Sequence, residues 1–327
     1  MTRIAVTGAS GFIGAQLVDR LLADGHTVVA LLRHESRSTG MEERGVEVIR
    51  GDVTDPAAVT RTVAGCAVIF HLARARAHSG LPIRVVESVN VGGAGIVAGA
   101  ASRAGAARLV LGSSLAVHGQ RPRMQPLTED APIHSESAYA RSKWRAEQEA
   151  RSRAGSTMSL VIARITTVFG PGCTSWLSFI RSIAKGRLRL IGRGDNWHHP
   201  ADVSDIVDGL VRCGTAPALA HSVYNLGGPE AVRIAELVRI IASELGVRGP
   251  QPRPVPALPI RLYLRLNAFT DVNWSLALPR AGSAAFLTSD RVFDLSRARH
   301  DLGYAPSVGV RDAVRRTVAW YRQRGLI

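Results

Sequence analysis

Short apolar runs alternate with amphipathic stretches over the first half of the chain. Six apolar runs have the length of β-strands, namely residues 4–7, 28–32, 46–49, 68–72, 109–111 and 160–163. The stretches between them have helical periodicity, namely residues 12–23, 56–64, 86–104 and 137–152. Strands that alternate with helices predict an α/β fold, a doubly wound parallel sheet with helices on both faces.

The alternation loosens after residue 164. Helices are still expected at 202–213, 234–245 and 310–324. Five prolines between 250 and 259 predict a rigid connector. We therefore expect the second half of the chain to form a smaller C-terminal lobe beside the sheet.

Composition excludes several classes of protein. Hydrophobic residues are 46% and charged residues 20%, as in ordinary globular proteins. The three cysteines form no CxxC pair, so we expect neither a disulfide framework nor a zinc site. We find no run of 18 apolar residues and no cleavable signal pattern, so we expect no membrane partner and a cytoplasmic location.

The net charge of +15 comes from 41 basic and 26 acidic residues. Only Lys143 and Lys185 are lysines, and the other 39 basic residues are arginines scattered along the chain. This distribution is typical of a coding bias toward arginine, so we expect no nucleic-acid partner. A lysine that is retained despite this bias is therefore expected to have a specific role.

Three glycines follow the first apolar run in Gly8-Ala9-Ser10-Gly11-Phe12-Ile13-Gly14. The first allows a tight turn, the second a close approach of the backbone to a pyrophosphate, and the third close packing of helix on strand. The N-terminus of the helix, at Phe12 and Ile13, presents free N–H groups to the phosphates. The position directly between a strand and a helix predicts a dinucleotide site.

Two polar positions bear on the choice of cofactor. Arg33 follows the second strand, where NAD-preferring sites usually have an acidic residue, and it can pair with a 2′-phosphate. We therefore favour NADP(H) as the cofactor, and NAD(H) is possible. The alternative interpretation of Arg33 is an ordinary surface arginine with no role in cofactor binding. After the third strand, Asp52 and Val53 are placed to contact the adenine, although Asp52 can also be a turn residue.

Tyr139 and Lys143 stand four residues apart, so they share one face of the expected helix. Tyrosine has a reference pKa near 10, and a neighbouring ammonium group stabilises its phenolate. Such a tyrosine can exchange a proton with a substrate oxygen while a hydride moves at the adjacent carbon. Ser113 and Ser114, at the end of the fifth strand, offer a hydroxyl to the same oxygen.

These motifs and several others resemble the extended short-chain dehydrogenases/reductases of the NAD-dependent epimerase/dehydratase family, nearly from end to end. The further matches are Phe70-His71-Leu72-Ala73, Asn90, Ser113 to Gly119 against "SSxxVYG", Leu127 to Pro132 against "TEDxP", Arg164 to Gly172 against "RxxxVYGPG", Asp202 to Asp205 against "hVxD", and Asp294 to Pro306 against "DxSKAxxxLGYxP".

The resemblance implies a role for each of these positions. Gly8, Gly11 and Gly14 would hold the pyrophosphate of the cofactor, and Asp52 would bind its adenine. Leu72 and Ala73 would flank the cofactor, and Asn90 would lie near its phosphates. Lys143 would bind the nicotinamide ribose. Ser114 would be the catalytic serine beside Tyr139 and Lys143. The resemblance also implies a homodimer through a four-helix bundle that includes the Tyr139 helix.

The family also implies a division of the chain. Residues 1–165 would form the dinucleotide-binding Rossmann domain, to which 195–230 would return. Residues 166–194 and 231–327 would form the substrate-binding lobe.

The substrate side departs from the pattern of the nucleotide-sugar enzymes. His198 stands where those members usually carry an arginine for the diphosphate, and the stretch 260–287 is apolar, as in hydroxysteroid dehydrogenases and dihydroflavonol reductases. His198 and His199 lack a carboxylate that would complete a metal site, so we expect no metal. Leu115 and Ala116, which follow Ser114, disfavour a 4,6-dehydratase.

Three functions remain. We place first an epimerase of a nucleotide-sugar, because the pattern of the whole chain is similar to such enzymes. The alternative is a net ketone reductase or alcohol dehydrogenase of the hydroxysteroid-dehydrogenase or dihydroflavonol-reductase type, which the NADP(H) signal of Arg33 favours. A catalytically silent, cofactor-binding scaffold is the third, and the intact Ser114, Tyr139 and Lys143 count against it.

Overall fold

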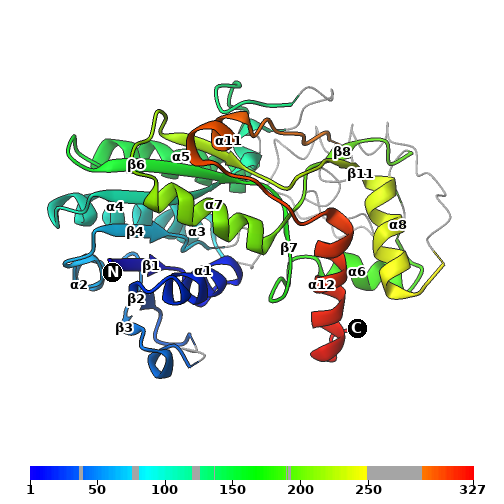
Figure 1. Cartoon of the computed structure of the whole chain (residues 1–327), viewed down its shortest axis with the longest axis horizontal. Coiled ribbons are helices and arrows are strands. Elements are labelled where there is room, and N and C mark those ends of the chain that lie inside the picture. The colour runs from blue at the N-terminus through cyan, green and yellow to red at the C-terminus, as the bar shows by residue number, and fades with distance from the viewer. Residues whose placement is uncertain are drawn as a thin grey trace.

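The alternating apolar runs form one parallel sheet of seven strands. The computed structural model describes residues 1–36, 40–75, 81–119, 126–135, 137–188, 190, 193–248 and 289–327. The strand order across the sheet is β10 (Val223–Leu226), β6 (Ser159–Ile165), β5 (Arg108–Ser114), β4 (Val68–His71), β1 (Arg3–Thr7), β2 (Thr27–Leu32) and β3 (Glu47–Arg50). All six expected strands are present, β10 is added at one edge, and the expected α/β class is confirmed (Figure 1).

Both faces of the sheet are buried, which explains why its strands are continuously apolar. On β1, Ile4 and Val6 belong to one hydrophobic core, while Ala5 belongs to another. Successive side chains of a strand point to opposite faces, so one apolar strand supplies two cores.

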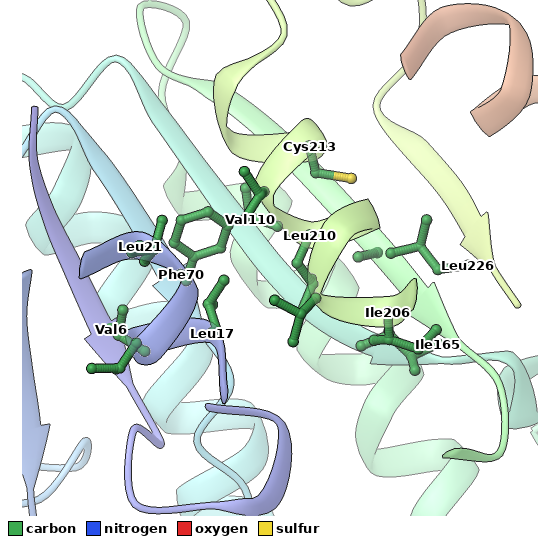
Figure 2. Close-up of a cluster of buried hydrophobic side chains, with 14 of the residues drawn as sticks. Val6, Leu17, Leu21, Phe70, Val110, Ile165, Ile206, Leu210, Cys213 and Leu226 are labelled. Carbon is green, nitrogen blue, oxygen red and sulfur yellow. The ribbon is translucent and has the colours of Figure 1, made fainter. Parts of the chain in front are cut away.

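Helices α1 (Phe12–Ala23) and α7 (Val203–Thr215) cover one face of the sheet. Leu17 and Leu21 of α1 and Ile206 and Leu210 of α7 pack in the same cluster with Phe70 of β4, as Figure 2 shows. The opposite face is covered by α2 (Pro56–Val63), α4 (Gly93–Arg103) and α5 (Ala138–Arg153).

The expected helix over 86–104 begins earlier and is not regular. It consists of α3 (Ile83–Glu87), a π-helical turn (Ser88–Gly92) and α4. Within the described residues, the helical segment Ile83–Arg103 is long and apolar enough to cross a membrane, although the sequence analysis found no such run. Half of the relevant window is buried, because α4 packs against α2 and α5.

A separate core lies beyond the carboxyl edge of the sheet. It is built from three helices, α6 (Leu177–Ala184), α8 (Ile234–Leu245) and α12 (Val310–Gln323). Two short sheets lie in the same part of the chain. One pairs β7 (Val168–Phe169) with β9 (Ala201–Asp202), and the other pairs β8 (Trp197–His198) with β11 (Val232–Arg233). A last helix, α11 (Ser296–Leu302), packs instead against β10 and α7. The expected proline connector at 250–259 and the apolar stretch 260–287 lie outside the described residues.

Candidate functional site

A large cleft opens where the strand order reverses. The chain runs from β1 through β2 to β3 on one side and then continues with β4 on the other side of β1. Ligands of open α/β sheets bind at such a switch point, beyond the carboxyl ends of the strands. The cleft has a volume of about 1140 Å³, and its walls include the glycine loop, the ends of β3, β4 and β5, and the start of α5.

The glycine loop is shaped for close contact. Gly8 has a φ of 74°, and a Cβ atom there would lie 2.6 Å from the backbone nitrogen of Ala73. A Cβ atom on Gly14 would lie 2.2 Å from the carbonyl oxygen of Gly8. Neither position tolerates a side chain, so strand, loop and helix can pack only with glycine here.

The N-terminus of α1 fits the pyrophosphate of a dinucleotide. Its N-cap is Gly11, without a side-chain cap, and its first turn has no acidic residue. Gly8, Gly11, Phe12, Ile13 and Gly14 all line the cleft. Uncapped N–H groups at the positive end of a helix attract phosphate oxygens.

Two residues of the expected adenine region also line the cleft, Asp52 and Val53. One oxygen of Asp52 accepts hydrogen bonds from the backbone nitrogen of Thr54 (2.9 Å) and from its hydroxyl (2.8 Å). Asp52 therefore stabilises a turn, and among the described residues its second carboxylate oxygen accepts no hydrogen bond that would compete with a ligand.

Arg33 lines the cleft beyond β2, but it is not alone there. Its Nη1 atom lies 3.0 Å from the Glu35 carboxylate, and both side chains are mostly exposed. A carboxylate near Arg33 was not expected from the sequence. Glu35 is thus a second candidate for contact with the ribose end of a cofactor, and its charge opposes that of Arg33.

Leu72 and Ala73 line the cleft directly after β4. Asn90, from the π-helical turn, is buried behind this segment. Its Oδ1 atom accepts a hydrogen bond from the Ala75 nitrogen at 2.8 Å, and its Nδ2 atom donates to Ser142 Oγ at 3.1 Å. The structure thus brings Asn90 to the loop after β4 and to α5, and both ends of its amide have partners within the protein.

Ser114, Tyr139 and Lys143 line the same cleft. Ser114 ends β5, and its Oγ atom accepts a hydrogen bond from the Ala116 nitrogen at 3.2 Å. Ser137 is the N-cap of α5, so Tyr139 falls in the first turn of that helix and Lys143 in the second. The structure therefore brings together the three residues that the sequence places 25 and 4 positions apart.

Lys143 is buried, and its Nζ atom donates a hydrogen bond to the Gly112 carbonyl oxygen at 2.8 Å. Burial and then the charge of Arg74 lower the pKa of this ammonium to about 7. Glu147, one turn further along α5, acts in the opposite direction. An amine with a pKa near neutrality is typical of reactive sites.

A buried polar network lies behind the catalytic strand and helix. Glu147 is fully buried and accepts hydrogen bonds from Arg164 Nη2 at 2.8 Å, from Arg164 Nε at 3.1 Å and from the Ser113 hydroxyl. Ser113 and Arg164 are register partners on β5 and β6, so the network joins both strands to α5. A charge pair of this kind is stable in a core only when its hydrogen bonds are satisfied.

The same network reaches the loop that precedes α5. Arg164 Nη1 donates to the Glu129 carbonyl oxygen at 2.9 Å. The Glu129 carboxylate accepts a hydrogen bond from the Asn225 nitrogen of β10 at 2.8 Å and lies 3.7 Å from Arg297 Nε of α11. Segments that are about 100 and 170 residues later in the chain thus anchor this loop.

The remaining wall of the cleft consists of residues that the sequence analysis did not single out. They come from β2 and the segment after it, α3 and the π-helical turn, the loop after β4, the end of β6, and α6 with the segment before it, and they include Arg74, Thr166, Thr167, Trp176 and Phe179. The sequence signal for the two threonines was the "RxxxVYGPG" match at Arg164 to Gly172. Nothing in the sequence pattern indicates that Arg74, Trp176 and Phe179 face the cleft.

His198 and His199 are not in the wall of the cleft. His199 Nε2 donates to the Gly228 carbonyl oxygen at 2.8 Å, and its Nδ1 atom accepts from the Phe293 nitrogen at 3.3 Å. His198 Nε2 lies 3.2 Å from Asn196 Nδ2. Among the described residues, no group of His, Cys, Asp and Glu side chains has the arrangement of a metal site.

Comparison with known proteins decides the family. The sequence profile of the NAD dependent epimerase/dehydratase family matches residues 4–227, which is more than half of the chain. The chain belongs to this family. The resemblance seen in the sequence is confirmed, and the protein is an enzyme of a NAD-binding family.

Family members of different activity resemble the chain to similar degrees. It is 30% identical to a 2-alkyl-3-oxoalkanoate reductase of Stenotrophomonas maltophilia, over 97% of this chain and 98% of the relative. It is 31% identical to a UDP-glucose 4-epimerase of Mycolicibacterium smegmatis, over 98% and 99%. A 3 beta-hydroxysteroid dehydrogenase/Delta 5-->4-isomerase of Mycobacterium tuberculosis is 29% identical, over 98% and 90%.

Solved structures agree with the fold. The crystal structure of gox2253 has a TM-score of 0.83 at 26% identity and covers all of both chains. MoeE5 in complex with UDP-glucose and NAD has a TM-score of 0.77 at 25% identity, over 98% of this chain and 99% of MoeE5.

Proposed function

We propose that the chain is an oxidoreductase that transfers a hydride between a nicotinamide cofactor and a secondary alcohol or ketone, with Tyr139 as the acid/base. The observation that supports this most directly is the position of Ser114, Tyr139 and Lys143 in one cleft with the glycine loop. When bound, the nicotinamide supplies or accepts the hydride.

Each of the three side chains has a defined task. In the direction of reduction, the Tyr139 phenol gives its proton to the substrate oxygen. The Ser114 hydroxyl donates a hydrogen bond to the same oxygen, because its Oγ atom only accepts from the Ala116 nitrogen. Lys143, fixed on the Gly112 carbonyl, places a cation near the phenol and is within reach of a ribose in the cleft.

The net reaction that the site supports best is the reduction of a ketone. His198 replaces the expected diphosphate-binding arginine. Neither His198 nor His199 lines the cleft, and both contact partners inside the protein. Trp176 and Phe179 present aromatic surface to the cleft instead. The relatives named as reductase and hydroxysteroid dehydrogenase support this choice.

An epimerase of a nucleotide-sugar, which the sequence analysis places first, is the second candidate. It is favoured by the relative named UDP-glucose 4-epimerase and by the likeness to MoeE5 in complex with UDP-glucose and NAD. An epimerase returns its hydride to the substrate, so it consumes no cofactor. A reductase consumes one NAD(P)H for each ketone.

This difference is the test. Purified protein is incubated with NADPH or NADH and medium-chain ketones, and loss of absorbance at the reduced nicotinamide band is followed. UDP-galactose is offered in parallel, and its conversion to UDP-glucose is followed by chromatography. Cofactor consumption supports the reductase, conversion without consumption supports the epimerase, and binding of cofactor without either reaction supports the silent scaffold.

Further features of the protein are part of the same proposal. NADP(H) is the preferred cofactor, because Arg33 places a cation beside the ribose end of the cleft. Residues 1–165 with 195–230 are the dinucleotide-binding domain, and 166–194 with 231–327 are the substrate-binding lobe. The protein is a cytoplasmic homodimer, and light scattering in solution tests its oligomeric state.

A further inference from the structure

Arg74 reaches into the reacting end of the cleft. It follows the end of β4 by three residues, and its side chain is exposed. Its guanidinium carbon lies 5.9 Å from the centroid of the Tyr139 ring. Arg74 is therefore the arginine of the cleft wall that lies against the acid/base itself, whereas Arg33 lies beyond β2.

The charge at this end of the cleft is not balanced. The described charged groups in its wall are Arg33, Asp52, Arg74 and Lys143, and Asp52 lies after β3. Lys143 donates to the Gly112 carbonyl. Among the described residues, the Arg74 guanidinium has no carboxylate within 4.0 Å and donates no hydrogen bond, and it lies against the Tyr139 ring instead.

Unpaired positive charge in a cleft attracts an anionic ligand. The two cations near Tyr139 also repel each other, which is why Arg74 contributes to the lowered pKa of Lys143. An anion beside Arg74 would relieve this repulsion. The guanidinium matches a carboxylate in a bidentate arrangement, which a point charge cannot do.

We propose that Arg74 binds a carboxylate of the substrate, close to the carbonyl that Tyr139 protonates. The proposal rests on the proposed function, because it places the reacting oxygen at Tyr139. Since the guanidinium lies against the same ring that carries the phenol, only a few bonds can separate carboxylate and ketone. The substrate class is therefore a 2-oxo or 3-oxo acid, or the corresponding hydroxy acid.

The rest of the substrate is apolar. Val168, Trp176 and Phe179 line the cleft on the side of α6. Trp176 is held in place by stacking on Phe169, with ring centroids 4.2 Å apart, and by a hydrogen bond from its Nε1 atom to the Val168 carbonyl at 3.1 Å. An aromatic wall in the same cleft as the Arg74 guanidinium favours an oxo acid with an alkyl chain.

A phosphate of the cofactor is another source of negative charge. The glycine loop, with the uncapped N-terminus of α1, already provides a place for the pyrophosphate. Arg74 lies instead over the residue that exchanges a proton with the substrate. The position of Arg74 thus favours the substrate as the source of the anion.

The first experiment measures binding without turnover. Calorimetry compares octanoate with octanamide on protein saturated with oxidised cofactor, for wild type, Arg74→Gln, Arg74→Lys and Arg239→Gln. Arg239 is an exposed residue of α8 outside the cleft and serves as the matched control. We expect wild type and Arg239→Gln to bind octanoate about 10- to 100-fold more tightly than octanamide, which corresponds to one charge-assisted hydrogen-bonded pair.

Arg74→Gln should remove this preference, and Arg74→Lys should keep part of it. Equal binding of both ligands by wild type overturns the proposal, and so does a preference that persists in Arg74→Gln. If Arg74→Gln instead weakens binding of the cofactor and leaves the preference for octanoate intact, the anion is the cofactor phosphate and the proposal is wrong.

The second experiment compares turnover of 3-oxooctanoate and its methyl ester with NADPH and NADH. We expect Arg74→Gln to lower kcat/KM by about 10- to 100-fold for the acid and little for the ester. Equal losses for both substrates mean that Arg74 acts only through Tyr139 and Lys143, which overturns the proposal. An octanoate preference that depends on Arg74 in a protein that reduces no ketone contradicts the proposed function but supports the carboxylate site.

Discussion

The Nζ atom of Lys143 lies 2.8 Å from the carbonyl oxygen of Gly112, inside a buried part of the cleft wall. This bond fixes the lysine of α5 to the end of β5, the strand that also carries Ser114. The relative position of the proposed catalytic groups is therefore set by a strand and a helix, not by flexible loops. Rigid supporting elements are what a precise site requires.

Replacement of Tyr139 by phenylalanine should abolish catalysis and spare the binding of cofactor. The ring remains in place and only the proton donor is lost, so kcat should fall by about 10²- to 10⁴-fold. Initial rates and a fluorescence titration with reduced nicotinamide separate the two effects. A variant that keeps more than a tenth of the rate would remove Tyr139 from the acid/base role.

Lys143→Met should lower activity and raise stability. The folded-state pKa of about 7 lies below the reference value of 10.5, so the folded chain holds this proton less tightly than the unfolded chain. The cost of the buried lysine is therefore greatest below pH 7 and shrinks as the pH rises toward 10.5, by at most about 1.4 kcal/mol per pH unit.

Thermal unfolding of the cofactor-free protein checks this. The Tm of Lys143→Met should exceed that of wild type at pH 7, and the gap should narrow by pH 9. Lys143→Arg should not restore activity, because the broad guanidinium cannot occupy the compact site of the ammonium. A gap in Tm that does not change with pH would contradict the lowered pKa.

Arg33 should strengthen the binding of NADP(H), and Glu35 should weaken it. Loss of a charge-assisted bond to a 2′-phosphate costs about 1.5–3 kcal/mol, so Arg33→Ala should weaken NADP(H) binding by about 10- to 100-fold and leave NAD(H) binding unchanged. Glu35→Gln should strengthen NADP(H) binding, because it removes a carboxylate that competes for Arg33. Equal affinity of wild type for both cofactors would refute the 2′-phosphate role.

Gly14→Ala should prevent cofactor binding and destabilise the protein. The new methyl group would lie 2.2 Å from the Gly8 carbonyl oxygen, which is far inside van der Waals contact, so the glycine loop must move. Gly92→Ala is the matched control, since a Cβ atom there meets nothing within 4 Å. The control should be neutral or stabilised by up to about 1 kcal/mol, as judged by Tm and cofactor titration.

Acid should destabilise the protein through His71. Burial, together with Lys143, lowers the pKa of this imidazole to about 3, and its Nδ1 atom lies 2.7 Å from Thr7 Oγ1. Between about pH 6.5 and 3, His71 is therefore protonated in the unfolded chain but neutral in the folded chain. The free energy of unfolding falls as the pH falls through that window.

His71→Gln removes this contribution. From pH 6.5 to pH 5, wild type should lose about 2 kcal/mol more than the variant, as measured by urea unfolding at each pH. Parallel pH profiles of the two proteins would show that His71 is protonated equally well in the folded and unfolded chain.

The local part of the site was predictable from sequence. The bounds of α1, Phe12–Ala23, were expected to the residue, because apolar periodicity and the glycine loop define them. The pairing of Tyr139 with Lys143 follows from helical spacing alone. These features depend only on residues that are neighbours along the chain.

Features that depend on tertiary contacts were not predictable. The sequence does not indicate that Arg74 lies against Tyr139, that Glu35 pairs with Arg33, or that a π-helical turn buries Asn90. Each depends on where a loop or an irregular turn meets a distant element. Strand β10 was also missed, because the polar Asn225 interrupts its four residues, so it lacks the continuous apolar run that marks the other strands of the sheet.

The anchoring of Glu129 by Asn225 and Arg297 has a consequence for the synthesis of the protein. Glu129 precedes the catalytic helix, but its partners leave the ribosome only much later. A nascent chain that ends after α5 contains the glycine loop, Ser114, Tyr139 and Lys143, yet lacks the groups that fix the loop in front of them. Contacts so distant along the chain form late, so we expect the catalytic centre to mature only when translation is nearly complete.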